Sequence, residues 1–322
     1  MAALSDASSP VVAPLRAIRA SQLEALLAEE TAVWRAELAW DFSPSAELVR
    51  RFVHMQALNG HALLVGEEAV GYEYFVFEEH KGLIGDLYVR REMPSEDWEN
   101  ALMAAAVREM MESPFLRRIE AQLMMLRQPL SRALPNAEFL RAYPRNFMSM
   151  DLRRAGSLQP GKAAARADIF EWSDGVQEEA ARLIALAYQG HVDGEINDQY
   201  RSVQGARRFL MNIIQYPGCG VFFQPASFLA FEPGSGRLVG LCLSSLVAQD
   251  AGHVTQVCVA PDWQGRGLGY ELMRRAIQTL AHHGCRQVSL TVTASNTAAV
   301  ELYQSIGFQT LRQFAAYVWE GF

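Results

Sequence analysis

Residues 254–269 read VTQVCVAPDWQGRGLG, an alternating apolar strand pattern that ends in a glycine-rich turn. Gly265, Gly267 and Gly269 stand directly before the helical pattern YELMRRAIQTLAHH. Glycine lacks the Cβ that keeps a ligand away from the backbone, and the first N–H groups of a helix have no acceptor within it. The helix dipole adds partial positive charge at the same end. The segment therefore predicts a backbone site for a phosphate or pyrophosphate group.

The spacing of these glycines excludes two common nucleotide motifs. No Lys-Ser or Lys-Thr pair follows them, as a P-loop requires, and they do not fit the G-x-G-x-x-G pattern of dinucleotide-binding folds. We therefore expect an anionic ligand other than a nucleoside triphosphate or NAD.

A second segment, residues 288–308, reads VSLTVTASNTAAVELYQSIGF and predicts a strand, a capped short helix and an apolar return. QGRGLG at 264–269, together with NTAAVELYQSIGF at 296–308, resembles the two sequence motifs of the GNAT superfamily of N-acetyltransferases. Those motifs have the forms Q/R-x-x-G-x-G/A and N-x-x-A-x-x-L-Y-x-x-x-G-F, and the chain satisfies both. The resemblance covers the C-terminal half of the chain.

The resemblance implies acetyl-CoA as the cofactor and Tyr303 as the general acid that protonates the leaving thiolate. It also implies that a backbone N–H of the strand polarises the thioester carbonyl. The cofactor-binding residues that it implies are Val257, Cys258, Val259, Gln264, Gly265, Arg266, Gly267, Leu268, Gly269 and Asn296.

Three of the residues named so far have a simpler interpretation beside the functional one. Arg266 can be a solvated turn residue, and Tyr303 can pack its ring under the sheet. Cys258 is a buried hydrophobe rather than a nucleophile, because no His stands in a context that marks it as a partner.

The general base is the least defined part of the predicted site. The cofactor strand carries no carboxylate, so His253 is its candidate base. The loop HVDGEIND at 191–198 borders the acceptor site in the family, and it contains His191, Asp193 and Glu195. Each of His191, Asp193 and Glu195 is a candidate base, with a solvated loop as the default interpretation of these charges, and we take Glu195 and His253 as the candidate catalytic residues.

Composition limits the other classes of function. The chain has 322 residues, half of them hydrophobic, and a formal net charge of −7, which suits two domains and argues against nucleic-acid binding. The four cysteines form no C-x-x-C pair and no cluster with His, so no metal site is expected. The N-terminus lacks a signal-peptide pattern and no apolar run reaches the length of a membrane span, so we expect a cytoplasmic protein without a membrane partner.

The C-terminal half shows a full set of α/β elements in the order of the family fold. The expected strands are 169–172, 228–231, 238–247, 253–259, 288–293 and a final ribbon at 308–319. The expected helices are 173–189, one that ends before Pro217, the glycine-led helix and the helix after Asn296.

The N-terminal half repeats this order at a shift of about 170 residues. Its expected elements are strands at 14–21, 61–65, 70–79 and 82–89, helices at 21–40 and 45–57, and a helix that begins near Ser95. The segment FLRAYPRNF at 139–147 replaces LYQSIGF and is expected as a helix interrupted by Pro144, without an equivalent of the tyrosine.

The shift places SEDWE at 95–99 on the glycine-rich turn of the other half. Glu96, Asp97 and Glu99 would repel a pyrophosphate, so the N-terminal half is expected to have lost cofactor binding. We expect these carboxylates to act as an ordinary capping set for their helix.

The sequence thus predicts an α/β (α+β) fold of two tandem GNAT-like domains, each a mixed, mostly antiparallel sheet flanked by helices. A degenerate domain at 1–154, a linker at 155–166 and a catalytic domain at 167–322 resemble the tandem layout of the mycothiol synthase type. The expected reaction is acetyl transfer to a primary amine of a small molecule. The alternatives are acetylation of a protein N-terminus or lysine, and a coenzyme A-binding sensor or scaffold without catalysis.

Overall fold

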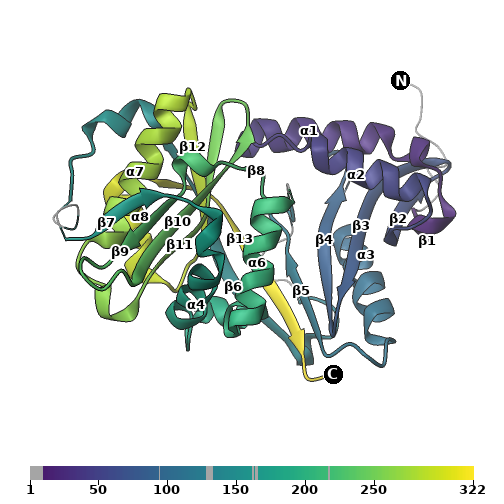
Figure 1. Cartoon of the computed structure of the whole chain (residues 1–322). Coiled ribbons are helices and arrows are strands. Elements are labelled where there is room, and N and C mark those ends of the chain that lie inside the picture. Colours follow the sequence, from purple (N-terminus) through teal and green to yellow (C-terminus); the bar gives the residue numbers. More distant parts are fainter. Residues whose placement is uncertain (1–9, 94, 128–132, 162, 164–165, 217) are drawn as a thin grey trace. The chain divides into compact units, whose positions relative to one another are not determined.

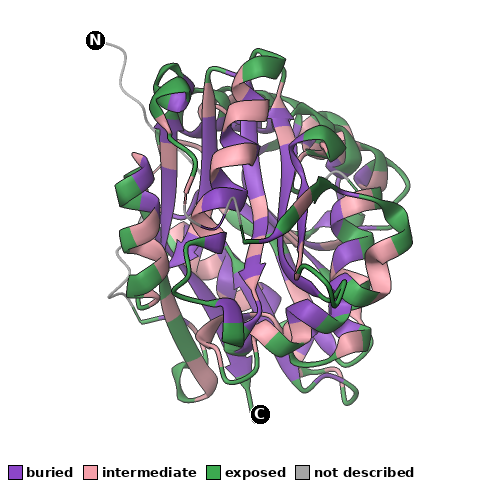
Figure 2. Ribbon diagram, turned by 60° about the vertical axis from the view of Figure 1, so that its left-hand side comes forward, coloured by how far each residue is buried: buried purple, intermediate pink, exposed green. Residues whose placement is uncertain are grey.

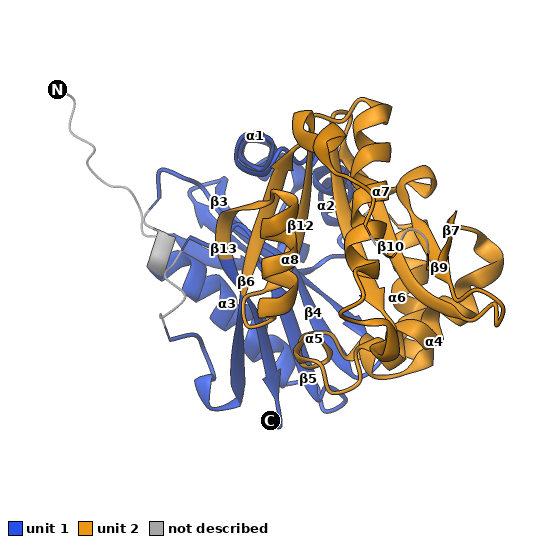
Figure 3. Cartoon of the chain, turned by 90° about the vertical axis from the view of Figure 1, so that its left-hand side faces the viewer, with its two compact units in different colours: residues 1–144, 314–322 blue, residues 145–313 orange. Residues whose placement is uncertain are grey.

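The computed structural model describes residues 10–93, 95–127, 133–161, 163, 166–216 and 218–322. The chain forms two compact units, shown in Figure 3. Unit 1 comprises residues 1–144 and 314–322, and unit 2 comprises residues 145–313. Each unit has an apolar core of its own.

Unit 1 is a mixed sheet with the strand order β1-β2-β3-β4-β5-β13, in which only β4 and β5 run parallel (Figure 1). Its strands are β1 Val11–Pro14, β2 Asn59–Val65, β3 Glu68–Glu78, β4 Lys81–Val89, β5 Arg118–Gln122 and the last part of β13 Gln309–Glu320. Its helices are α1 Glu24–Leu38, α2 Ser43–His54 and α3 Ser95–Met111.

Unit 2 is a mixed sheet with the order β6-β12-β11-β10-β9-β7, in which only β11 and β12 run parallel. Its strands are the last part of β6 Leu140–Asp151, β7 Asp168–Glu171, β8 Val221–Phe222, β9 Phe228–Phe231, β10 Leu238–Ala248, β11 Ala251–Val259 and β12 Gln287–Thr293. Its helices are α4 Gln177–Ala187, α5 Val192–Ile196, α6 Val203–Gln215, α7 Leu268–His283 and α8 Thr297–Ile306. In both units the strands and the helices that cover them share the buried residues (Figure 2). The predicted fold class is confirmed.

The packing of glycines shows that the two units repeat one design. In unit 1, a Cβ on Gly82 of β4 would lie 2.3 Å from the sulfur of Met110 on α3. In unit 2, a Cβ on Gly252 of β11 would lie 2.7 Å from Cδ1 of Leu280 on α7. Gly252 and Leu280 each lie 170 residues after their counterparts in unit 1, Gly82 and Met110. The strand-to-helix distance is therefore set by the same glycine contact in each unit.

The strand pairing repeats as well. β3 and β4 shift register between Tyr74 and Phe75, which leaves Gly85 as a bulge, and β10 and β11 shift between Leu243 and Ser244, which leaves Thr255 as a bulge. The parallel pair β4–β5 ends at Ile84, and the parallel pair β11–β12 ends at Val254. These common irregularities indicate a true internal repeat rather than two unrelated α/β domains.

The final strand of each repeat belongs to the unit of the other repeat. Residues 145–151 of β6, which end the first half of the sequence, pair with all of β12 in unit 2. Ala316–Glu320 of β13 pair with β5 in unit 1, where Trp319 and Tyr317 join the core. The compact units therefore divide the chain at 144/145 and 313/314, whereas the sequence predicted a division around a linker at 155–166.

The described residues of the segment 155–166 lie against α7 of unit 2. The Ala155 and Leu158 carbonyls accept hydrogen bonds from Gln278 Nε2, and the Gly161 N–H donates to Glu271 Oε2 at 3.1 Å. Residues 162, 164 and 165 lie outside the described residues. A segment rich in glycine, proline and alanine is thus hydrogen-bonded to α7 here, so this composition does not by itself indicate a free linker.

Four local predictions were wrong. The segment 14–21 is not a strand, because β1 ends at Pro14 and two short 3-10 turns follow that bury Leu15 and Ile18. The polar loop at 191–198 contains α5, and the predicted helix at 173–189 is shorter.

The segment around Pro144 is the most instructive of these errors. It is strand β6 rather than an interrupted helix. Pro144 directly precedes Arg145, the first residue paired with β12, so its missing N–H removes no bond from that ladder.

Candidate active site

Strands β11 and β12 separate where the predicted cofactor residues lie. They pair only through Ala251–Val254, although β11 stays paired with β10 up to Val259. After the bulge at Thr255, the backbone of Val257, Cys258 and Val259 therefore has no pairing with β12. A strand edge without a partner can accept an extended ligand as an added strand.

The glycine-rich turn follows this open edge directly. Gly265 has φ +70° and Gly267 has φ +84°, and a Cβ on either would meet nothing within 4 Å. Within the described part of the chain, the N–H groups of residues 265–269 have no hydrogen-bond acceptor. Gly267 is the N-cap of α7, which runs for 16 residues. Free N–H groups at the end of a long helix can hold an anion, and binding of a pyrophosphate at this turn stays a prediction.

Side chains around the turn fix its shape. The Trp263 indole is buried and donates to Glu232 Oε1, and the Arg266 guanidinium lies 5.5 Å from the centroid of the Trp263 ring. Gln264 Nε2 folds back onto the Val259 carbonyl at 3.3 Å. Arg266 thus adds positive charge beside the free N–H groups while its side chain is supported by stacking.

Helix α8, which carries Asn296 and Tyr303, packs against the start of α7, where a Cβ on Gly269 would lie 3.6 Å from Cδ2 of Leu302. Asn296 is the N-cap of α8, where its Oδ1 accepts from the Ala299 N–H. Tyr303 is buried, and no group of the described residues hydrogen-bonds its hydroxyl. Burial, followed by electrostatic interactions with Cys242 and Asp193, raises the pKa of Tyr303 well above its usual range. The hydroxyl therefore keeps its proton and has no partner that competes for it.

Two further tyrosines of unit 2 lie close by, and sequence reasoning missed them. Gln256 Nε2 donates to the Tyr188 hydroxyl at 2.7 Å, and the Tyr200 hydroxyl donates to Gln256 Oε1 at 3.3 Å. Their rings stack with centroids 4.5 Å apart. Gln256 precedes the predicted cofactor residues in β11, and that adjacency was the one available signal. Burial also raises the pKa of Cys258, which favours its interpretation as a hydrophobe.

The two candidate bases differ in their surroundings. His253 is buried, its Nδ1 lies 2.9 Å from Ser289 Oγ, and burial lowers its pKa to about 3. Glu195 is exposed and forms an ion pair with Arg201 at 3.1 Å. Neither is linked by a described contact to Tyr303. The described residues include no group of His, Cys, Asp and Glu that could hold a metal ion.

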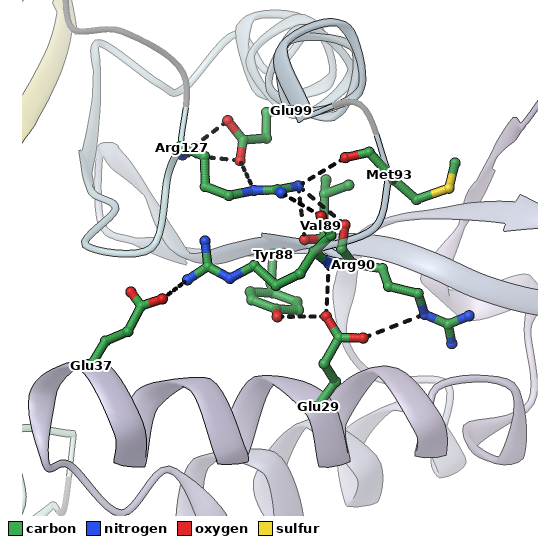
Figure 4. Close-up of polar contacts among 9 residues, drawn as sticks. Glu29, Glu37, Tyr88, Val89, Arg90, Met93, Glu99 and Arg127 are labelled. Atoms are coloured by element: carbon green, nitrogen blue, oxygen red, sulfur yellow. Dashed lines mark hydrogen bonds and ion pairs between the residues drawn. The ribbon is translucent and has the colours of Figure 1, made fainter.

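The corresponding loop of unit 1 is filled by an internal guanidinium (Figure 4). Arg127, which follows β5, donates from Nη1 and Nη2 to carbonyl oxygens of the loop that follows β4. These acceptors are Val89, Arg90, Arg91 and Met93, at 3.0 to 3.4 Å. The Arg127 N–H donates to both carboxylate oxygens of Glu99, and Nε lies 3.5 Å from Glu99 Oε1. The loop thus presents carbonyl oxygens to the Arg127 guanidinium, and its Arg91 N–H donates to Glu29 Oε1 at 2.7 Å.

The predicted capping role of the carboxylates at 96–99 is wrong for Glu99. Its side chain is only 1% exposed and holds Arg127. Glu99 stands at the position of Gly269, where the other unit has no side chain. The two turns therefore differ at this position, because unit 1 has a buried carboxylate paired with Arg127 where unit 2 has a glycine.

The fold places the chain among proteins with tandem GNAT domains. A crystal structure of a GCN5-related N-acetyltransferase from Sphaerobacter thermophilus superposes with a TM-score of 0.65 at 18% identity, covering 97% of this chain and 95% of that one. A tandem GNAT protein from the clavulanic acid biosynthesis pathway gives a TM-score of 0.55 at 15% identity, covering 82% and 83%.

Residues 196–308 match the acetyltransferase (GNAT) family, so the chain contains a domain of that family. Among curated proteins, it is 39% identical over 87 residues to the mycothiol acetyltransferase of Saccharopolyspora erythraea, covering 27% of this chain and 29% of that protein. It is also 39% identical over 101 residues to the mycothiol acetyltransferase of Mycobacterium sp. (strain JLS), covering 30% and 34%. The chain thus spans about a third of the length of these relatives. The resemblance predicted from the two motifs is confirmed. No helix of the described residues is long and apolar enough to cross a membrane.

Proposed function

We propose that this protein transfers an acetyl group from acetyl-CoA to a primary amine of a small molecule, and that unit 2 does the chemistry. The observation that carries the proposal is the juxtaposition of an open strand edge, a turn with free N–H groups and a tyrosine hydroxyl without a partner. The relatives named mycothiol acetyltransferase support a small molecule as the acceptor.

The residues of unit 2 suit acetyl-CoA. The N–H groups of residues 265–269 would hold the pyrophosphate, with Gln264 and Arg266 beside them. The backbone of Val257, Cys258 and Val259 would pair with the pantetheine arm. Asn296 would hydrogen-bond the same arm. Bound acetyl-CoA supplies a thioester: the amine nitrogen forms a bond to the acetyl carbon, the C–S bond breaks, and its electron pair leaves on sulfur.

The protein contributes a proton and a dipole to this reaction. Tyr303 holds a proton at its hydroxyl that can pass to the departing sulfur, because its raised pKa keeps it neutral. A backbone N–H of Val257 or Cys258 can polarise the carbonyl where negative charge develops. Before attack, the ammonium of the acceptor must lose its proton to a base.

A thiol-release assay with acetyl-CoA tests the proposal across a panel of amines. The panel contains polyamines, aminoglycosides, amino acids, short peptides and the unacetylated form of mycothiol, the small molecule in the relatives' names. Turnover with a small amine supports the proposal. Turnover with peptides alone supports protein acetylation instead, and acetyl-CoA binding without turnover of any amine identifies a sensor or scaffold.

A further inference from the structure

Asp193 lies in the short helix α5, at the end of β12 in unit 2. Its Oδ1 accepts a hydrogen bond from the hydroxyl of Thr293, the last residue of β12. Arg145 Nη1 lies 3.8 Å from the same oxygen, and the Asp193 side chain is 15% exposed. Arg145 is itself buried, and its Nε has no hydrogen-bond partner within the described residues. A hydroxyl and a guanidinium thus hold one oxygen of this carboxylate in place.

The other carboxylate oxygen is available. Asp193 Oδ2 accepts no hydrogen bond from the described residues, and its nearest ionisable partner is His191 Nδ1 at 3.7 Å. His191 Nε2 lies 3.2 Å from Asn296 Nδ2, so the His191–Asp193 segment contacts the cap of α8. The segment is therefore attached to both ends of the connection between β12 and α8.

The charge of Asp193 reaches the hydroxyls around the open strand edge. After burial, it is among the causes that raise the pKa values of Tyr303, Tyr188 and Tyr200. The Tyr188 ring packs edge-on against His191 with centroids 5.2 Å apart, and His191 Nδ1 accepts a hydrogen bond from the Asp193 N–H, so the segment with Asp193 borders the tyrosine pair. Glu195, two residues further along α5, points instead to Arg201.

We propose that Asp193, positioned by Thr293 and Arg145, binds the ammonium group of the acceptor and takes its proton. Oδ2 accepts the N–H of the ammonium, the proton passes to the carboxylate directly or through water, and the electron pair left on nitrogen attacks the acetyl carbon. Thr293 and Arg145 are positioning residues in this scheme. The inference rests on the proposed function and names the acceptor class as cationic amines.

The test compares Asp193→Asn with two other variants of unit 2. Asparagine keeps the size of the side chain and its contact with Thr293 but loses the charge. We expect kcat/KM for the amine to fall by about 10²–10⁴-fold, with acetyl-CoA affinity unchanged by calorimetry. Glu178→Gln serves as the matched control, because Glu178 is an exposed carboxylate on α4 with surface ion pairs to Arg182 and Arg207. Glu195→Gln tests the competing base.

A binding readout separates catalysis from folding. With coenzyme A present in place of acetyl-CoA, the wild type should bind the amine in calorimetry, and Asp193→Asn should bind it at least tenfold more weakly. Thr293→Val keeps the carboxylate and should raise KM for the amine by less than Asp193→Asn does.

The outcomes distinguish a failure of the role of Asp193 from a failure of the proposed function. An active wild type with an equally active Asp193→Asn, or a loss confined to Glu195→Gln, overturns the role of Asp193 and leaves the proposed function intact. A wild type that turns over no amine overturns both. If Asp193→Asn loses acetyl-CoA affinity as strongly as activity, Asp193 supports the fold of the site and the assignment is wrong.

Discussion

The loop after β11 in unit 2 and the loop after β4 in unit 1 occupy the same position in two copies of one fold. In unit 2 the turn has left-handed glycines at 265 and 267 and leaves its N–H groups free. In unit 1 four carbonyl oxygens of the loop surround the Arg127 guanidinium, which Glu99 balances. The comparison shows how one scaffold carries a loop with free N–H groups in unit 2 and a loop occupied by internal side chains in unit 1, so that a function belongs to the site rather than to the fold.

The largest effect should come from the tyrosine that only unit 2 provides. Tyr303→Phe keeps the ring and removes the proton donor, so turnover should fall by about 10²–10⁴-fold while acetyl-CoA affinity is retained. Tyr270→Phe is the control, because Tyr270 lies on α7, its hydroxyl donates to the Gln159 carbonyl, and it has no proposed role in transfer. Steady-state kinetics and calorimetry measure both. Undiminished turnover in Tyr303→Phe would return this residue to a packing role.

Removal of the internal cation should destabilise unit 1 strongly. Arg127→Met removes the guanidinium that lies 3.5 Å from the buried Glu99 carboxylate and keeps the backbone N–H contact, and loss of one charge of a buried pair typically costs about 3–5 kcal/mol. Arg91→Met, which breaks the more exposed ion pair with Glu37, should cost less than about 1 kcal/mol. Urea unfolding measures the two losses.

The same Arg127→Met variant sharpens the comparison between the loops. We expect calorimetry to find one acetyl-CoA per chain in the variant as in the wild type, because unit 1 still lacks the glycines and retains Glu99. Binding of a second acetyl-CoA with equal affinity would mean that the Arg127 guanidinium alone prevents unit 1 from binding the cofactor.

A smaller change should convert the turn of unit 2 toward that of unit 1. Gly267→Glu places a side chain at φ +84° and a carboxylate beside the free N–H groups. The left-handed backbone lowers stability by about 1–2 kcal/mol for a non-glycine residue, whereas the carboxylate repels the pyrophosphate and lowers affinity. Acetyl-CoA should bind about 100-fold more weakly, since each 1.4 kcal/mol of binding free energy is a factor of ten.

Gly284→Glu provides the matched control for this change. Gly284 has φ +103° at the other end of α7 and also opens onto free space. It carries the same strain and charge far from the turn, so it should lower stability without lowering acetyl-CoA affinity. Equal losses of affinity in both variants would attribute the effect to strain in α7.

The smallest expected effect is a pH dependence that belongs to unit 1. Burial raises the pKa of Glu73 to about 7, against its 2.6 Å contact with His61. Burial acts to lower the pKa of His61, but Glu73 and Glu109 outweigh it and raise the pKa. The folded state thus holds more protons than the unfolded state, so this stabilisation is full at low pH and is lost as pH rises from about 4.5 through 7.

The register equivalent of Glu73 in unit 2 is Cys242, whose pKa burial raises to about 12, so it stays neutral across this range. We expect the free energy of unfolding to fall by about 1–3 kcal/mol between pH 5 and pH 8, and Glu73→Gln to flatten this slope. Denaturant unfolding at several pH values measures both. A slope that persists in Glu73→Gln would assign it to other groups.

Local sequence signals predicted the parts of the molecule that local chemistry controls. The glycine-rich turn, the capped helix at Asn296 and the repeat at a 170-residue shift follow from spacing within short segments, and each appears in the structure. The roles assigned to the individual site residues stay predictions.

Contacts between distant segments could not be predicted from the same signals. Arg127 lies 28 residues beyond Glu99, and nothing in its neighbourhood marks it as a partner of the loop after β4. Asp193 and Glu195 are indistinguishable as loop carboxylates until Thr293, 100 residues away, selects one of them. The pairing of β13 with β5 is also a long-range choice, since an apolar ribbon can join any open strand edge.

The place of β13 has a consequence for the order in which the protein can fold during synthesis. Residues 314–322 follow all of unit 2 in the sequence, yet Ala315, Tyr317 and Trp319 complete the core of the unit that is made first. Unit 1 must therefore wait until these residues have been synthesised before its sheet can close, while residues 145–151 are ready for β12 as soon as it emerges. Unit 2 is the one that can mature first, and loss of residues 314–322 would damage unit 1 rather than the unit that they follow in sequence.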